Sequence, residues 1–171
     1  RALNPVPSLF ALAGVTDSTT WANLESLAKQ EQMVAVLALP AGTSVSAAVS
    51  AKQGAGLDTP NVNLLKDHVK FFDTNNNQYR LVPPTPVYMG RVATLGPHES
   101  PGNKQVYGIV STENSDGLPY GISDLALLEQ NGIIPIMKPI PRGKVFGIRH
   151  GQNTSSNELT NGVEYARMTH F

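Results

Sequence analysis

The stretch that decides the fold runs from Leu125 to Arg167 and reads LALLEQNGIIPIMKPIPRGKVFGIRHGQNTSSNELTNGVEYAR. It begins as an amphipathic helix, for which Ser123 is a suitable N-cap. The residues that share the apolar face of this helix are Ile122, Leu125 and Leu128. Asn131-Gly132 then supplies a left-handed stop, so the helix is expected to end there.

Two short strands and a turn follow the helix. Ile133–Met137 and Val145–Ile148 are apolar runs of strand length, and the residues that break the chain between them are Pro139, Pro141 and Gly143. After a polar excursion, Val163–Arg167 is expected to form a closing strand. The stretch therefore predicts a helix that leads into a β-hairpin.

The chain upstream predicts a βαβ unit. Leu9–Val15 indicates a buried strand, and Asp17–Thr20 holds side chains that favour helix N-caps. The helix is expected to end near Gln30, and the residues at helical spacing in it are Trp21, Leu24, Leu27 and Ala28. Met33–Leu39 is a continuous apolar run, which is typical of a strand covered on both sheet faces.

The middle of the chain predicts smaller elements. A helix is expected at Ser44–Lys52 and a loop at Gly54–Pro60. A hairpin of Val69–Phe72 and Tyr79–Val82 is expected around the polar turn Asp73–Gln78. Further along, we expect a short helix at Val87–Ala93, a strand at Val106–Val110 and an exposed turn at Glu113–Pro119. We therefore expect an α/β fold, with a mixed central β-sheet flanked by helices and additional β-hairpins. The whole chain, residues 1–171, is expected to form one domain.

Composition narrows the functional classes. The chain has 171 residues, of which 40% are hydrophobic, and this suits a packed core. Thirteen basic and 13 acidic side chains balance, so non-specific attraction to nucleic acid is not expected. There is no cysteine, which excludes disulfides and thiolate chemistry and suits a reducing cytoplasm. No apolar run approaches the roughly 20 residues that span a bilayer.

The sequence motifs for catalysis and cofactor binding are missing. There is no Gly-x-Ser-x-Gly elbow and no Walker loop, and Gly54-Ala55-Gly56 follows a predicted helix rather than a strand. Asp73–Asn77 starts like a calcium loop, but Gln78 stands where that loop needs glycine and Pro84 where it needs glutamate. A solvated hairpin turn is the favoured interpretation of this tract. We expect no cofactor and no metal.

The histidines are dispersed along the sequence. His68, His98, His150 and His170 lack the i, i+4 spacing of a helical metal pair, so each is expected to be a surface or structural residue. Serine, histidine and aspartate are all present, and a triad from distant positions stays open, but no activated pair can be named. The chain is therefore not expected to be an enzyme.

One asymmetry of charge stands out. Between Met137 and Asn157 the sequence has four basic residues and no acidic one, namely Lys138, Arg142, Lys144 and Arg149. A solvated hairpin explains this stretch without any function. The alternative is a contact surface for an acidic partner, in which charge complementarity sets register and orientation.

Several segments follow one another along the chain: the helix DSTTWANLESL at Asp17–Leu27, the strand end Leu39-Pro40-Ala41-Gly42, the break Val82-Pro83-Pro84 before Gly90–Ala93, the junction Leu128–Ile136, and the closing pieces Phe146–Arg149 and Val163–Arg167. In this order they resemble the central domain of contractile phage tail sheath proteins. Their succession covers nearly the whole chain. Pro83–Pro86 stands where relatives have a Pro-Pro-Ser-Gly-like break, and a lone Arg167 where they have consecutive arginines, so the resemblance implies a divergent branch, among giant myoviruses.

The resemblance implies a structural role. Such subunits stack as hexameric rings in a helical array around a tail tube, meet a baseplate, and contract to drive the tube through the host envelope. It implies contacts to neighbouring subunits or the tube at the four basic residues and Arg167. It also implies a virion protein made in the host bacterial cytoplasm, with no nucleic acid partner and no membrane insertion.

Two other interpretations stay open. The chain opens at Arg1 rather than Met, so we expect a piece of a longer protein. The first alternative is a small α/β hydrolase-like or nucleotide-binding enzyme domain, because strand-helix-strand order serves many functions. The second is a binding module that uses the hairpin between Met137 and Asn157.

Overall fold

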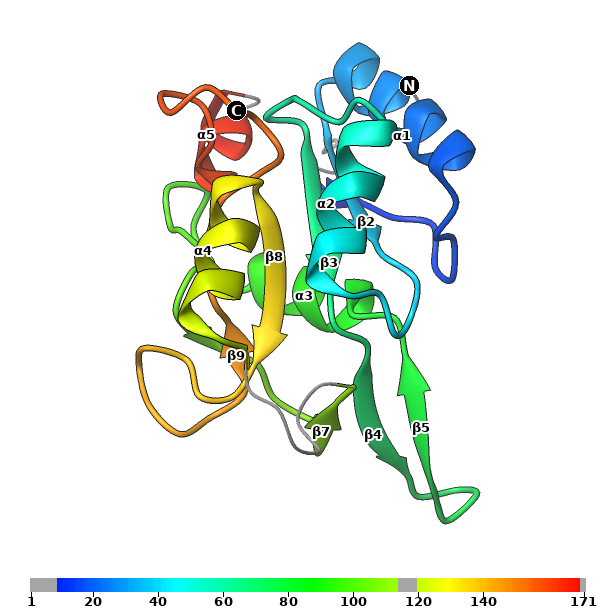
Figure 1. Cartoon of the computed structure of the whole chain (residues 1–171). Coiled ribbons are helices and arrows are strands. Elements are labelled where there is room, and N and C mark those ends of the chain that lie inside the picture. The colour runs from blue at the N-terminus through cyan, green and yellow to red at the C-terminus, as the bar shows by residue number, and fades with distance from the viewer. Residues whose placement is uncertain (1–8, 114–119, 170–171) are drawn as a thin grey trace.

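A six-stranded sheet in the order β1-β2-β3-β8-β9-β6 runs through the middle of the molecule (Figure 1). In this computed structural model, which describes residues 9–113 and 120–169, a three-stranded sheet in the order β5-β4-β7 lies at one end. β1, β2, β3 and β8 are parallel, whereas β9 pairs antiparallel with both β8 and β6. The mixed α/β fold expected from the sequence is confirmed.

The described residues form short strands and helices along the chain. The strands are β1 Leu9–Phe10, β2 Val34–Ala38, β3 Val62–Lys66, β4 Val69–Asp73, β5 Gln78–Val82, β6 Lys104–Gln105, β7 Ser111–Thr112, β8 Ile133–Met137 and β9 Gly147–Ile148. The helices are α1 Ser18–Glu31, α2 Val45–Gly54, α3 Thr85–Ala93, α4 Ile122–Gln130 and α5 Val163–Thr169. A helix joins β1 to β2 and another joins β2 to β3, whereas a turn joins β8 to β9.

Helices cover both faces of the large sheet, which gives three layers. On one face α1, α2 and α4 pack on a cluster that includes Trp21, Leu37 and Leu128. On the other face α3 and α5 pack on a second cluster, which includes Val36 and Tyr88. Neighbouring residues of β2 point to opposite faces, so a strand buried on both sides needs an apolar residue at every position. This explains the continuous apolar run at Met33–Leu39.

Side-chain caps fix the starts of α1 and α2. The Asp17 carboxylate accepts a hydrogen bond from Thr20 N at 2.8 Å, and Ser44 Oγ accepts one from Ala47 N at 3.2 Å. Each cap satisfies a backbone N–H that has no partner within the helix. Both predicted helices and the βαβ unit are confirmed, with β1 parallel to β2.

Sequence reasoning missed the central strand β3. Its sequence, VNLLK, places Asn63 and Lys66 in a strand buried along its whole length, and these polar residues conceal the apolar pattern. Asn63 is fully buried and its Nδ2 donates to Tyr88 Oη at 3.2 Å. Buried polar groups are tolerated when they are hydrogen-bonded. The strand therefore forms despite its composition.

The junction of α4 and β8 follows the sequence prediction closely, but the start of the helix does not. Gly121 rather than Ser123 is the N-cap, and its N–H donates to Asp124 Oδ2 at 3.3 Å. Of the predicted apolar face only Leu128 is buried, whereas Ile122 is 90% exposed. Gly132 has a φ of 61° and ends the helix as predicted.

The predicted closing strand at Val163–Arg167 is wrong, because this segment is helix α5. Its buried residues are Val163, Ala166 and Arg167. This spacing of three and four residues is helical. The polar excursion before it is held by side-chain hydrogen bonds of Asn153 and by an isolated antiparallel bridge between Gln152 and Gly162.

Other predicted strands are shorter than expected. Leu9–Val15 pairs only at Leu9 and Phe10, and Leu12 is 48% exposed. Val106–Val110 is not a strand, because this segment crosses from β6 in the large sheet to β7 in the small one and only its flanks are paired. Val145–Ile148 is reduced to Gly147 and Ile148. The predicted turn at Glu113–Pro119 lies, beyond residue 113, outside the described residues.

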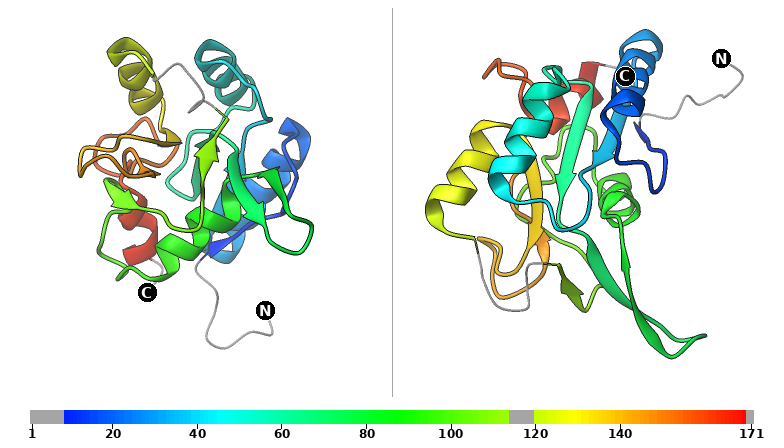
Figure 2. Two further views of the ribbon diagram at one scale, coloured as in Figure 1. Left: turned by 90° about the horizontal axis from the view of Figure 1, so that it is seen from below. Right: turned by 45° about the vertical axis from the view of Figure 1, so that its right-hand side comes forward.

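The β4–β5 hairpin projects beyond the rest of the fold in the right-hand view of Figure 2. Its turn is the tract that had resembled a calcium loop. The Asp73 carboxylate accepts hydrogen bonds from Asn75 N and Asn76 N, and Asn77 has a φ of 49°. The predicted solvated hairpin turn is confirmed.

Candidate functional site

The turn between β8 and β9 is the first candidate site, and we call residues 138–144 the basic turn. Ile140, only 3% exposed, anchors it, and Ile140 and Gly143 form an isolated antiparallel bridge. The Arg142 N–H donates to the Asn103 side chain. A turn that is tied to the core at these points presents its other side chains in a fixed position.

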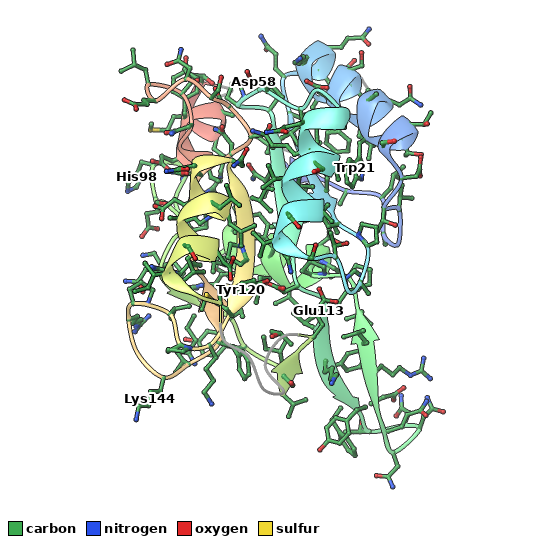
Figure 3. All side chains as sticks on the ribbon, in the orientation of Figure 1. Trp21, Asp58, His98, Glu113, Tyr120 and Lys144 are labelled. Atoms are coloured by element: carbon green, nitrogen blue, oxygen red, sulfur yellow. The ribbon has the colours of Figure 1, made fainter. Side chains whose placement is uncertain are left out.

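Three of the four basic residues lie on this turn. Lys138, Arg142 and Lys144 are exposed, and the Lys138 Nζ lies 5.3 Å from the centroid of the Phe146 ring. Among residues 9–113 and 120–169 none of the three is in an ion pair. Figure 3 shows Lys144 at the outer end of the turn. Their positive charge is thus directed to the surface and not neutralised within the described part of the chain.

Arg149 lies apart from the basic turn. Its backbone N–H donates to Pro135 O at 3.1 Å, which places it halfway along β8, and its side chain is half-buried. The structure therefore brings together Lys138, Arg142 and Lys144 but leaves Arg149 outside the group.

Arg167 is in a different place and is 4% exposed. It lies on α5, and its Nη2 donates to Leu95 O at 2.9 Å and to Val92 O at 3.4 Å, at the C-terminal end of α3. A cation is favoured there because the last carbonyls of a helix carry partial negative charge. Burial lowers the pKa of Arg167. Arg167 therefore caps the C-terminal end of α3. Its contact with a neighbouring subunit or the tube stays a prediction.

A buried polar cluster, which the sequence did not reveal, lies where β3 ends. The Lys66 Nζ donates to Asp67 Oδ1 at 3.0 Å and to Tyr120 Oη at 2.7 Å, and Tyr120 Oη donates to the same carboxylate. Lys66 and Asp67 are each 2% exposed. Burial raises the pKa of Asp67, and the Lys66 ammonium opposes this rise. The carboxyl ends of parallel strands are common ligand sites, so this cluster is where an enzyme site is expected.

Within the described residues, the neighbours of this cluster are engaged in contacts of their own. His68 Nδ1 lies 3.9 Å from Glu113 Oε2, which accepts a hydrogen bond from Gly42 N at 2.9 Å. Burial lowers the pKa of His68. Lys66 is the side chain that holds the Asp67 carboxylate, and Glu113 is engaged by a backbone N–H. These contacts join β3, the loop after β2 and the residue after β7, which is a structural role.

The other histidines match the structural interpretation. His98 is exposed, whereas His150 is buried, with Nε2 2.9 Å from Ile133 O. His170 lies outside the described residues. In the described ranges no three His, Asp or Glu side chains are close enough to hold a metal ion. Nor does any described helix have the length and apolar character to cross a bilayer.

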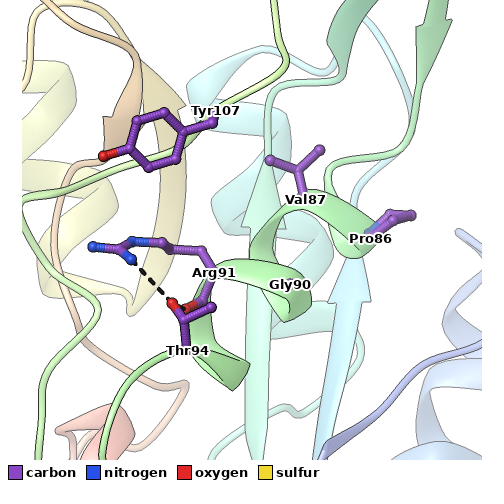
Figure 4. A pocket seen from close by; sticks show the side chains of 6 residues that line it. All are labelled: Pro86, Val87, Gly90, Arg91, Thr94 and Tyr107. Carbon is purple, nitrogen blue, oxygen red and sulfur yellow. Dashed lines mark hydrogen bonds between the residues drawn. The ribbon is translucent and has the colours of Figure 1, made fainter.

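A hollow of about 360 Å³ lies beside α3 (Figure 4). Its lining residues are Pro86, Val87, Gly90, Arg91, Thr94 and Tyr107. Arg91 Nη1 donates to Thr94 Oγ1 at 3.0 Å. The described lining includes no carboxylate, histidine, lysine or serine, so the hydroxyls of Thr94 and Tyr107 have no side-chain base beside them within it.

The fold and its surface define a class: a three-layer α/β domain with a mixed sheet and a basic turn whose charge is not compensated by an ion pair within the described residues. No protein-family model matches the chain, and no curated protein matches it significantly. Solved structures do, and they show that the chain has a contractile sheath-like fold. The sheath complex of an extracellular contractile injection system, PVC, in the contracted state matches with a TM-score of 0.70 and 17% identity over 95% of the chain.

Two structures of the anti-feeding prophage also match. Its helical sheath in the contracted state gives a TM-score of 0.65 at 16% identity over 95% of the chain, and its six-fold symmetrised baseplate gives 0.63 at 13% identity over 90%. The chain spans 44%, 43% and 40% of these three solved chains, respectively. The expected sheath-like fold is confirmed.

Proposed function

We propose that the chain is the core domain of a structural subunit of a contractile phage tail sheath. The domain comprises residues 1–171 of a longer protein. In this role subunits stack as hexameric rings around a tail tube, meet a baseplate and contract together to drive the tube through the host envelope. The observation that carries the proposal is the fold match over 95% of the chain to a sheath in the contracted state.

The architecture suits a part that moves without deforming. Helices cover both faces of the large sheet, and two hydrophobic clusters fill the space between the layers. Close-packed interiors resist continuous deformation, so a change of lattice is taken up between subunits rather than inside them. The proposed place of action is the virion, after synthesis in the bacterial cytoplasm.

The role is structural rather than enzymatic. The side chains of the buried polar cluster are hydrogen-bonded to one another, and the described lining of the hollow beside α3 has no carboxylate, histidine, lysine or serine. We assign the basic turn to contact with a neighbouring subunit or the tube. Its uncompensated charge would orient an acidic partner more than it would add affinity.

Electron microscopy of the full-length subunit tests the proposal. We expect hollow tubes or stacked rings, and dispersed single particles at all concentrations and ionic strengths would contradict it. A variant with Lys138→Glu and Arg142→Glu is expected to assemble poorly while its circular dichroism spectrum is unchanged. Unaltered assembly of this variant at physiological salt would show that the basic turn is not part of the contact.

A further inference from the structure

An acidic hollow lies at the other end of β8 from the basic turn. It encloses about 250 Å³, and its two charged lining residues are Glu129 and Glu158. Glutamine, serine and asparagine side chains complete the lining, with no lysine or arginine. Small-molecule pockets usually enclose about 300–1,000 Å³ and are mostly apolar. This hollow is smaller and polar, so it fits a charged side chain better than a ligand.

The position of Glu129 makes the hollow more negative. Glu129 lies in the last turn of α4, where the helix dipole disfavours an anion, and that turn has no basic residue. Glu129 and Glu158 are exposed, and within the described ranges neither is in an ion pair. The arrangement costs stability, and within the described residues no ion pair compensates for it.

The loop that presents Glu158 is held rigidly. Asn153 is fully buried, and its Nδ2 donates to Thr160 O at 2.7 Å and to Gly162 O at 2.9 Å. Asp58 accepts hydrogen bonds from the Ser156 backbone and hydroxyl at 2.7 and 2.8 Å, which lower the pKa of Asp58. A loop that is ordered before binding loses little entropy when a partner docks.

The hollow and the basic turn are on opposite ends of the same body. Figure 3 shows Lys144 at one end and Asp58, which holds the loop of the hollow, at the other. The two surfaces are opposite in charge, each is unpaired within the described chain, and the chain as a whole is neutral. A contact between two different patches of identical subunits is heterologous, and repetition of such a contact produces rings or helical filaments.

We propose that the acidic hollow receives the basic turn of a second copy of this chain. This inference rests on the proposed assembly and names its two faces: Lys138, Arg142 and Lys144 on one copy, and Glu129 and Glu158 on the next. Leu159, 86% exposed beside Glu158, adds apolar contact area at the rim.

A charge exchange in the full-length subunit tests the pairing. The variant Lys144→Glu and the variant Glu158→Lys should each raise the concentration needed for assembly about two- to fivefold per ion pair lost. The variant with both changes restores opposite charges and should assemble nearly like the parent. The inference is overturned if the double variant is no better than the worse of the two single variants.

Cross-linking provides an independent test, because the chain has no cysteine. A mixture of a Lys144→Cys variant and a Glu158→Cys variant should form a disulfide-linked heterodimer under mild oxidation, and less of it at high salt. A Lys144→Cys variant mixed with a Ser50→Cys variant is the control, because Ser50 is exposed on α2 and does not line the hollow. Equal yields from both mixtures would exclude the contact. If the parent forms tubes but both tests fail, this pairing is wrong and the sheath proposal stands.

Discussion

Replacement of Gly132 by alanine is the sharpest perturbation of the fold. Gly132 joins α4 to β8 with a φ of 61°, and a Cβ there would overlap the Asn153 carbonyl. The obstacle is backbone, and the Asn153 side chain holds that backbone through two hydrogen bonds. The strand β8 and the loop of the acidic hollow therefore meet at a point with no room for a methyl group.

The magnitude follows from two contributions. A left-handed conformation costs an alanine about 1–2 kcal/mol, of which about 0.4–1 kcal/mol is offset by the lower entropy of its unfolded chain. Overpacking against a fixed neighbour adds about 1–3 kcal/mol. We expect Gly132→Ala to lower the free energy of unfolding by about 1–5 kcal/mol.

Gly56→Ala is the matched control. Gly56 has a φ of 65°, and a Cβ built on it meets no atom within 4 Å, so only the conformational contribution remains. Urea denaturation of both variants should show Gly132→Ala to be less stable by about 2 kcal/mol, which corresponds to roughly 4–8 °C in Tm for a chain of this size. Equal losses in the two variants would refute the proposed close contact between Gly132 and Asn153.

Three further predictions concern the cap of α3, a buried histidine and the cap of α2. Arg167→Met should lower the free energy of unfolding by about 1–3 kcal/mol in chemical denaturation, because two carbonyls at the end of α3 lose their donor; no loss would mean that the cap is dispensable. Burial lowers the pKa of His150 below its usual 6.5, so the unfolded chain binds the proton more readily and stability should fall as pH drops through about 6.5. The raised pKa of Asp67 acts in the opposite direction. The measurement is therefore the free energy of unfolding of the parent and of His150→Asn at pH 7.5 and at pH 5.5, and identical pH dependence in the two proteins would contradict the lowered pKa of His150. Ser44→Ala should cost about 1 kcal/mol in thermal unfolding through loss of the cap, whereas Ser50→Ala, on the exposed face of the same helix, should be neutral; equal effects would argue against the cap.

The elements that the sequence predicted well are those with a strong local signal. Asp17 and Ser44 cap their helices, Gly132 ends α4, and β8 has the predicted bounds, since each depends on a few adjacent residues. The strand β3 could not be predicted in this way. Its Asn63 is fully buried and donates a hydrogen bond to Tyr88, which lies 25 residues further along the chain.

Of the two candidate surfaces, the basic turn could be predicted from the sequence and the acidic hollow could not. The basic turn was visible as a run without acidic residues, because its three cations are neighbours in the sequence. Glu129 and Glu158 come from a helix end and a loop that only the tertiary structure brings together. A glutamate in the last turn of a helix, where a cation is favoured, was the one local signal.

The central claim is that this domain is the repeating unit of a contractile sheath. A cryo-electron microscopy reconstruction of the assembled full-length subunit tests it most directly. We predict that the three-layer domain fits the repeating density as a rigid body, with the basic turn against the acidic hollow of a neighbour. An assembly whose density cannot accommodate the domain, or a protein that forms no ordered assembly, would contradict the claim.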